Sequence, residues 1–158
     1  MSLSPHLARW VWASVSKSFE DRRGWLYLFF EGDDRAIPEA DKLNFAEFRM
    51  DGPRLHEVSR NYWQVDVYVN ILIQTTMTND THAYFKTLGH VQSLYVPCIP
   101  VYRYGDGPDD DGSLVGFLQL NIDKPLEQLK GSNFGQVDQT VRLQQGTVEA
   151  NYRMFLST

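Results

Sequence analysis

An alternating run of β-branched residues restricts the fold of this chain more than any other feature. Every second residue from position 65 to position 73 is valine or isoleucine, namely Val65, Val67, Val69, Ile71 and Ile73. Because successive side chains of a β-strand point to opposite faces, the pattern predicts a strand with one buried and one mostly polar face. Tyr62, Trp63 and Gln74 would extend it to about 40 Å, at about 3.3 Å per residue. A strand that outgrows its own core commonly packs against something else.

Two other stretches have the periodicity of amphipathic helices. Ser4 and Pro5 suit the start of the first helix, and Gly24 suits its end. Between them, apolar residues recur at a spacing of four, namely Leu7, Val11, Val15 and Phe19. Residues 78–80 offer a cap for the second helix. Its apolar residues follow at three- and four-residue spacing, namely Tyr84, Phe85, Leu88 and Val91.

The segments between the first helix and the long strand predict two shorter strands. Residues 25–30 are apolar and aromatic, which is typical of a strand buried on both faces. Residues 45–50 suit another strand, which we expect to end in a turn at residues 51–53, Asp-Gly-Pro. Residues 31–44 are interpreted as a turn and a loop, and residues 125–130 as one helical turn.

The second half of the chain predicts two β-hairpins. Residues 95–104 contain two prolines, so their strand should lie at a sheet edge or contain a bulge. Residues 114–122 would return as its partner. The last hairpin is expected between residues 137–143 and 148–156, with its turn at residues 145–146, Gln-Gly.

Together these elements predict an α+β fold, in which about two amphipathic helices pack on one face of an antiparallel or mixed β-sheet. The chain has 158 residues, of which 42% are hydrophobic and 22% charged. This length suits a single domain over residues 1–158, without a metal or disulfide to support it.

Charge and cysteine content exclude several classes of protein. The net charge of −5 argues against a sequence-independent DNA binder, which would carry a basic stripe. A single cysteine, Cys98, excludes an intramolecular disulfide and the multi-cysteine zinc motifs. Residues 1–20 lack the apolar run of a signal peptide, and no apolar stretch is long enough to cross a membrane. We therefore expect a protein of a soluble, reducing compartment.

An acidic, glycine-rich turn at residues 105–112 is the most conspicuous candidate for a binding site. Its carboxylates belong to Asp106, Asp109, Asp110 and Asp111. An EF-hand is excluded, because with Gly112 at the sixth position Leu118 would take the twelfth, which needs a bidentate glutamate. The turn is interpreted as a solvated hairpin tip that keeps an exposed edge soluble. Contact with a basic surface of a neighbouring molecule is the alternative.

Three histidines and the cysteine are weak candidates for chemistry. His82 and His90 would lie about 12 Å apart on the second helix, too far for two ligands of one metal ion. Together with His56 they are interpreted as surface or helix-packing residues. Cys98 lies between two prolines of a strand, which favours a small buried core residue over a nucleophile. We expect no catalytic residue, no metal and no cofactor.

Aromatic residues are abundant, with 9 Phe, 8 Tyr and 4 Trp. Tyr102, Arg103 and Tyr104 together have the composition of a stacking platform for nucleic acid. The acidic turn that follows argues against a phosphate-bearing partner at this place. Aromatic residues also fill cores and anchor protein–protein interfaces, and that interpretation is preferred.

The order of the elements resembles that of the tail terminator, or tail completion, proteins of long-tailed bacteriophages, and more loosely other phage head–tail joining proteins. The segments that carry the resemblance are the opening helix at residues 4–19, the long strand at 62–74, the helix at 80–94 and the closing strand at 148–156. It covers most of the chain and is a resemblance of pattern, without a short diagnostic motif. The loop at 33–44 and the acidic turn depart from it.

The resemblance implies a homo-oligomeric ring, usually a hexamer, that is part of the virion and assembles in the host cytoplasm. Such a ring caps the tail tube, stops its polymerisation and docks to the head connector, so its partners are the tail-tube protein and the connector protein. Genomic DNA would pass through the lumen without specific binding, and no membrane is involved. As contact residues we expect those of two segments, namely Asp33, Asp34, Arg35, Asp106, Asp109, Asp110 and Asp111.

Two alternatives remain open from the sequence. One is a tail-tube or baseplate ring subunit, which would stack into long tubes or form a ring elsewhere in the virion. The other is a small-molecule-binding or enzymatic α+β domain, with an enclosed pocket near His56, His82 or His90.

Overall fold

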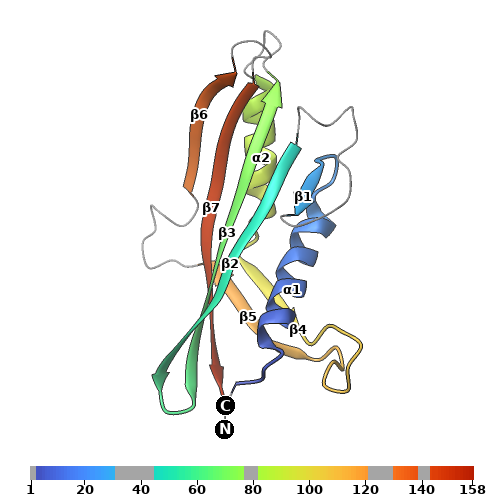
Figure 1. Ribbon diagram of the computed structural model, residues 1–158, viewed down its shortest axis with the longest axis vertical. Coiled ribbons are helices and arrows are strands. Elements are labelled where there is room, and N and C mark those ends of the chain that lie inside the picture. Colours follow the sequence, from blue (N-terminus) through green and yellow to red (C-terminus); the bar gives the residue numbers. More distant parts are fainter. Residues whose placement is uncertain (1–2, 31–44, 77–81, 121–129, 139–142) are drawn as a thin grey trace.

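Two helices cover one face of a mixed, strongly curled β-sheet (Figure 1). The computed structural model describes residues 3–30, 45–76, 82–120, 130–138 and 143–158. Its helices are α1 (Leu7–Arg22) and α2 (His82–Leu94). The strands formed by the described residues are β1 (Leu28–Phe30), β2 (Phe45–Ser59), β3 (Tyr62–Thr76), β4 (Cys98–Tyr102), β5 (Leu114–Leu120), β6 (Lys130–Asp138) and β7 (Leu143–Ser157). The predicted α+β fold is confirmed.

The sheet has the order β1-β2-β3-β7-β5-β4, and β6 pairs with the first half of β7. Only β1 runs parallel to its neighbour, β2, among the strand pairs of the described residues. The long central strand is confirmed, since β3 pairs with β7 along its whole length and with β2 from Tyr62 to Gln74. All five of its alternating Val and Ile side chains are fully buried in the core.

The first helix is confirmed, with a different start. The cap residue of α1 is His6, whose side chain makes no capping bond. Ser4 instead forms the turn before it, where its Oγ accepts a hydrogen bond from the His6 N–H at 3.2 Å. Gly24 ends the helix region with φ +58°, a left-handed conformation that glycine adopts without a Cβ clash.

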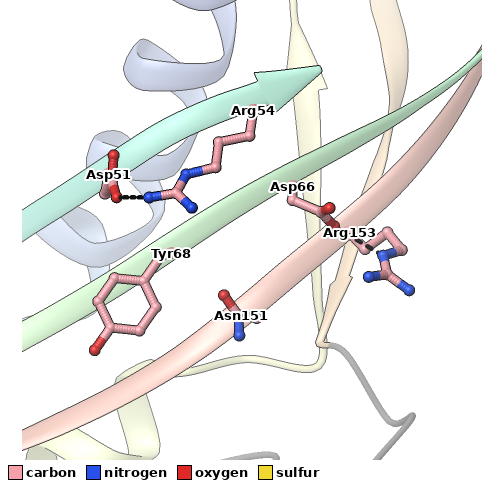
Figure 2. Close-up of a pocket in the computed structure, with 6 residues that line it drawn as sticks. All are labelled: Asp51, Arg54, Asp66, Tyr68, Asn151 and Arg153. Atoms are coloured by element: carbon pink, nitrogen blue, oxygen red, sulfur yellow. Dashed lines mark hydrogen bonds and ion pairs between the residues drawn. The ribbon is translucent and has the colours of Figure 1, made fainter. Parts of the chain in front are cut away.

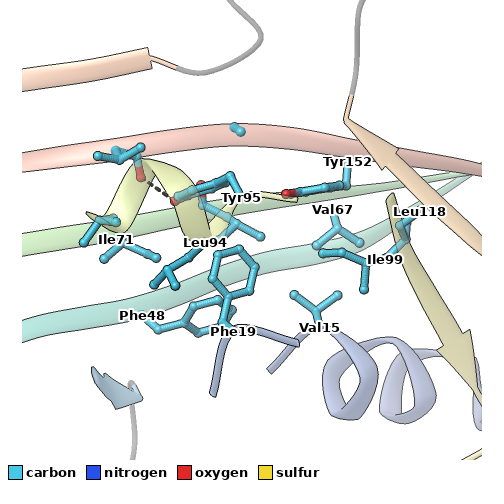
Figure 3. Packing of buried hydrophobic residues seen from close by; sticks show 14 of the residues in the cluster. Val15, Phe19, Phe48, Val67, Ile71, Leu94, Tyr95, Ile99, Leu118 and Tyr152 are labelled. Atoms are coloured by element: carbon cyan, nitrogen blue, oxygen red, sulfur yellow. Dashed lines mark hydrogen bonds between the residues drawn. The ribbon is translucent and has the colours of Figure 1, made fainter. Parts of the chain in front are cut away.

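The core lies between the helices and the sheet (Figure 3). Phe19 of α1 joins the two layers, since its ring centroid is 5.0 Å from that of Phe48 and 5.1 Å from that of Tyr95. Tyr95 follows α2 and donates its hydroxyl hydrogen to the carbonyl oxygen of Val148, at 2.5 Å. Because both helices contact these shared residues, they lie on the same face of the sheet.

The predicted turn at residues 51–53 is wrong, because β2 continues through it to Ser59. The register with β3 shifts between Asp51 and Arg54, so the strand absorbs one extra residue as a bulge. Gly52 makes this possible: its φ is +112°, and an added Cβ would lie 2.9 Å from the carbonyl oxygen of Asp66. A Gly-Pro pair is typical of turns, but here it forms a bulge inside a 15-residue strand.

Two further strand predictions need correction. The aromatic segment 25–30 is not a strand buried on both faces, because β1 is a three-residue edge strand and Trp25 is 60% exposed. The last hairpin is shifted, because residues 145–146 lie within β7 and its partner β6 starts at Lys130. The edge position of the proline-containing strand β4 is confirmed. The loop at 31–44, the helix cap at 78–80 and residues 125–129 lie outside the described residues.

Candidate interaction surface

The face of the sheet that points away from the helices bears the mostly polar residues that alternate with the buried Val and Ile of β3. An open depression on it is lined by Asp51, Arg54, Asp66, Tyr68, Asn151 and Arg153 (Figure 2). These side chains come from β2, β3 and β7, and Figure 2 shows the helices behind the strands that bear them. We call this side the outer face.

Charges in the depression are neutralised in pairs. The Nη2 of Arg54 lies 2.5 Å from Oδ2 of Asp51, and the Nε of Arg153 lies 2.8 Å from Oδ1 of Asp66. Tyr68 donates a hydrogen bond to the carboxylate of Glu149. Burial and this bond raise the pKa of Tyr68 to about 12, so its hydroxyl keeps its proton at neutral pH. The depression therefore suits a polar protein surface better than a strongly charged ligand.

Beside the depression, the outer face carries exposed aromatic side chains. Tyr62 and Phe155 stack with ring centroids 5.6 Å apart and an interplanar angle of 3°, and they are 40% and 48% exposed. Phe117 of β5 is 50% exposed. The pairing of Gln119 with Arg153 puts Phe117, two residues earlier, on the same face as Phe155. We call Tyr62, Phe117 and Phe155 the aromatic patch.

Tyr62 and Phe155 belong to a part of the sheet that we call the distal arm, made of residues 54–65 and 154–157. Figure 1 shows the turn between β2 and β3 projecting beyond the end of α1. On the helix side of the arm, Leu55 is 46% exposed although its partner in β3, Val65, is buried. Val58, at the second register shift of β2, is 49% exposed. The arm thus exposes apolar side chains on both of its faces.

The arm holds a larger share of the exposed apolar side chains than its length would lead one to expect. Of the nine large apolar side chains that are exposed in the described residues, four lie in the arm, namely Leu55, Val58, Tyr62 and Phe155. Single exposed apolar residues are normal on protein surfaces, whereas a cluster marks an interaction surface. The sequence signal for it was present, because Tyr62 is the first residue of the outer-facing series of β3.

The acidic turn is folded against the start of α1, so it is not a simple solvated tip. Asp110 receives hydrogen bonds from the Arg9 Nη2 at 2.9 Å and the Trp10 Nε1 at 2.6 Å, and its side chain is only 3% exposed. Its other oxygen accepts the N–H of Gly107 at 3.0 Å. The bond from Arg9, followed by that from Trp10, holds the pKa of Asp110 well below the usual carboxyl range.

The other predicted contact residues differ in their surroundings. Asp111 accepts bonds from the Ser113 Oγ at 2.6 Å and N–H at 2.9 Å, which lower the pKa of Asp111. Asp106 is exposed, and Asp109 is exposed with its carboxylate 3.6 Å from the Nε2 of His6. The turn therefore presents Asp106 and Asp109 to solvent. The remaining three, Asp33, Asp34 and Arg35, lie outside the described residues.

The histidines do not form a site in the described residues. His56 is exposed on β2. His90 of α2 packs against the segment that follows α1. Its Nε2 lies 2.7 Å from the carbonyl oxygen of Arg23, and its ring centroid lies 4.8 Å from that of Trp25. The side chain of His82 lies outside the description. Within the described residues, no group of three His, Cys, Asp or Glu side chains could hold a metal ion.

Cys98 is exposed, so the expectation of a buried core residue is wrong. It starts β4, where Ile99 and Val101 take the inward positions and leave the alternate side chain outside. Arg103 is engaged within the chain, since its guanidinium lies 5.5 Å from the Trp10 ring centroid and bonds to Ser113. The grouping of Arg103 with two tyrosines therefore belongs to the packing of the acidic turn.

Comparison with known proteins gives a likeness of fold. No family model and no curated protein sequence matches the chain. A solved structure of a protein whose label states no function is similar, with a TM-score of 0.50 and 8% sequence identity, over 95% of this chain and 94% of that one. At this identity the similarity concerns the fold alone. Among the described helices, neither has the length and apolar character needed to cross a membrane.

Proposed function

We propose that the protein is a bacteriophage structural protein that forms a ring at the end of the tail tube, ends tube polymerisation and joins the tail to the head connector. The observation that carries this proposal is the distal arm, whose β2–β3 turn projects beyond the end of α1 and which exposes apolar side chains on both faces. The exposed apolar side chains of such an arm are removed from water only when another protein surface covers them.

The order of elements adds support, because it follows the pattern on which the resemblance to tail terminators rests. The opening helix, the long strand, the second helix and the closing strand occur at the expected places. The paired charges of the outer face are suited to recognition by shape and hydrogen bonding, which is what stacking on a tube end requires.

The mechanism we propose is binding without chemistry. One face of the ring complements the last ring of the tube and joins it as a further tube ring would. The opposite face lacks the surface that accepts the next tube ring, and it docks to the connector. The net charge of −5 would let DNA pass through the lumen without holding its phosphates.

A polymerisation assay tests this function. The tail-tube protein of the same virus is allowed to form tubes, and this chain is added at increasing concentration. We expect tubes that shorten as the concentration rises, each with one extra ring at a single end in electron micrographs. Long tubes made by this chain alone would favour the tube-subunit alternative. Tubes of unchanged length and bare ends, with this chain at saturating concentration, would contradict the proposal.

A further inference from the structure

We infer that the distal arm of one copy docks against the acidic turn of the next copy, and that this contact closes the ring; the inference rests on the proposed ring function. The arm supplies the apolar surface, and its tip carries cations. The turn and the start of β5 supply carboxylates and a further exposed apolar side chain. Because the exposed charges of the two surfaces are opposite, the occupant that we infer for each is a second copy of the chain.

The tip of the arm carries one exposed cation, Arg60, that has no ion-pair partner among the described residues, whereas Arg54 is paired with Asp51. The ionisable side chains of the tip are Arg54, His56, Glu57 and Arg60. The side chain of Arg54 is 75% exposed and forms an ion pair with Asp51. Arg60 lies in the turn between β2 and β3, is exposed, and makes no ion pair with a described residue. Of the two arginines of the arm, Arg60 is therefore the more available to a neighbouring molecule.

The acidic turn offers the complementary charge in a fixed shape. Asp106 and Asp109 point to solvent, while Asp110 ties the turn to Arg9 and Trp10 of α1. Leu114, two residues beyond the turn at the start of β5, is 43% exposed. Since the turn is already held in place, docking on it costs little ordering of the chain.

The positions of the two surfaces suit a closed ring. In Figure 1 the turn between β2 and β3 and the segment between β4 and β5 lie in the same lower part of the molecule, one on the left and the other on the right. A contact between two different surfaces on opposite flanks is head-to-tail, and such a contact generates a ring when the rotation between neighbours closes. A patch that bound its own copy would instead stop at a dimer.

The same charges argue for a second copy over other partners. A nucleic acid would be attracted to Arg60 and repelled by Asp106 and Asp109 on the same side of the ring. A second copy satisfies both ends at once, because each ring position joins one arm to one turn. Opposite charges across such a contact set its register and partner choice.

A charge-exchange experiment tests the contact. One variant carries Arg60→Glu, a second carries Asp106→Lys with Asp109→Lys, and a third combines all three changes. All altered residues are exposed, and the milder variants Arg60→Gln and Asp106→Asn repeat the test if a reversal disturbs folding. Lys86→Glu on α2 serves as the control, because it makes the same charge change as Arg60→Glu away from both surfaces.

The concentration at which half of the chains are assembled is measured by light scattering. We expect it to rise about tenfold or more for the first and second variants, and to return to within about threefold of the unaltered chain for the third. A mixture of the first and second variants should also assemble, since each arm then meets an oppositely charged turn. The control variant should behave as the unaltered chain does.

Two outcomes overturn the inference in distinguishable ways. If the unaltered chain forms rings and caps tubes, but the reversals assemble equally well or the exchange restores nothing, the arm–turn contact is wrong and the proposed function stands. If the unaltered chain stays monomeric at every concentration and also on tube ends, the ring function and the contact both fail.

Discussion

Tyr62 and Phe155 stack nearly parallel on the outer face of the sheet, with ring centroids 5.6 Å apart, although each ring is close to half exposed. The pair joins β3 to β7 at the part of the sheet that projects beyond the helices. Two aromatic rings that hold each other in place form a rigid surface, which a partner can cover without first ordering the side chains.

Replacing both rings tests whether this surface is used for assembly. In Tyr62→Ser with Phe155→Ser we expect the free energy of unfolding of the subunit to fall by about 1 kcal/mol or less, because both side chains are exposed. We expect assembly to weaken by about 2 kcal/mol or more, because buried aromatic anchors dominate interfaces. Urea unfolding and light scattering measure the two quantities. Phe85→Ser, on α2 and 54% exposed, should leave assembly unchanged.

A substitution at the junction of helix and sheet tests the core. Phe19 is fully buried between Phe48 and Tyr95, so Phe19→Ala should lower the free energy of unfolding by about 3–5 kcal/mol. The matched control is Phe85→Ala, whose side chain is largely exposed and should cost less than about 1 kcal/mol. Equal losses in the two variants, measured by urea unfolding, would contradict the described packing.

Removing one hydroxyl group tests how the end of α2 is joined to β7. Tyr95→Phe leaves the carbonyl oxygen of Val148 without the bond that it accepts at 2.5 Å. We expect a loss of about 1 kcal/mol in the free energy of unfolding. The same change at Tyr62, whose side chain is 40% exposed, should have almost no effect and serves as the control. An unchanged free energy of unfolding in both variants would contradict this bond.

The acidic turn should respond to acid in a specific pH range. The ordinary pKa of an aspartate side chain is about 3.9. The hydrogen bonds from Arg9 and Trp10 hold the pKa of Asp110 well below that value. A depressed carboxyl pKa contributes stability that is complete above the ordinary pKa and is lost as the pH falls toward the folded-state value. The free energy of unfolding that this contact contributes should therefore be complete at pH 5 and fall progressively below about pH 4, while the contact itself persists in the folded protein to lower pH.

The indole N–H resonance of Trp10 follows this contact directly, because that group donates to Asp110. In the unaltered chain we expect its shift to be constant from pH 7 through pH 4, and to move only at the lower pH at which Asp110 takes up a proton in the folded protein. In Asp110→Asn the shift should already be altered at pH 7 and should lack the acid step. A resonance that titrates identically in both proteins would show that Asp110 is not the partner.

The parts of the fold that could be predicted from the sequence are those whose pattern is local and regular. The alternation through β3 needs no tertiary information, because each buried position is β-branched and the opposite face is mostly polar. The four-residue spacing of α1 is equally explicit. Predictions failed where a local signal has two structural uses. Gly52 is typical of a turn, and it also permits the bulge through which β2 continues.

The candidate surface could be predicted only in part, because its residues meet across the sheet. Tyr62 and Phe155 are 93 positions apart in sequence (155 − 62), and no local pattern indicates that they stack. The same holds for Trp10 and Asp110, whose bond turns an apparently solvated loop into a fixed one. Which carboxylates of the acidic turn face solvent is likewise decided by α1, which the turn sequence does not contain.

The mass and shape of the purified chain test the central claim most directly. Light scattering over a wide range of concentrations, with electron microscopy of the same samples, distinguishes a closed ring from the alternatives. We predict a single assembled species of fixed subunit number that appears as isolated rings and never as long tubes, either alone or on the ends of tail tubes. A chain that stays monomeric under all these conditions would contradict the account.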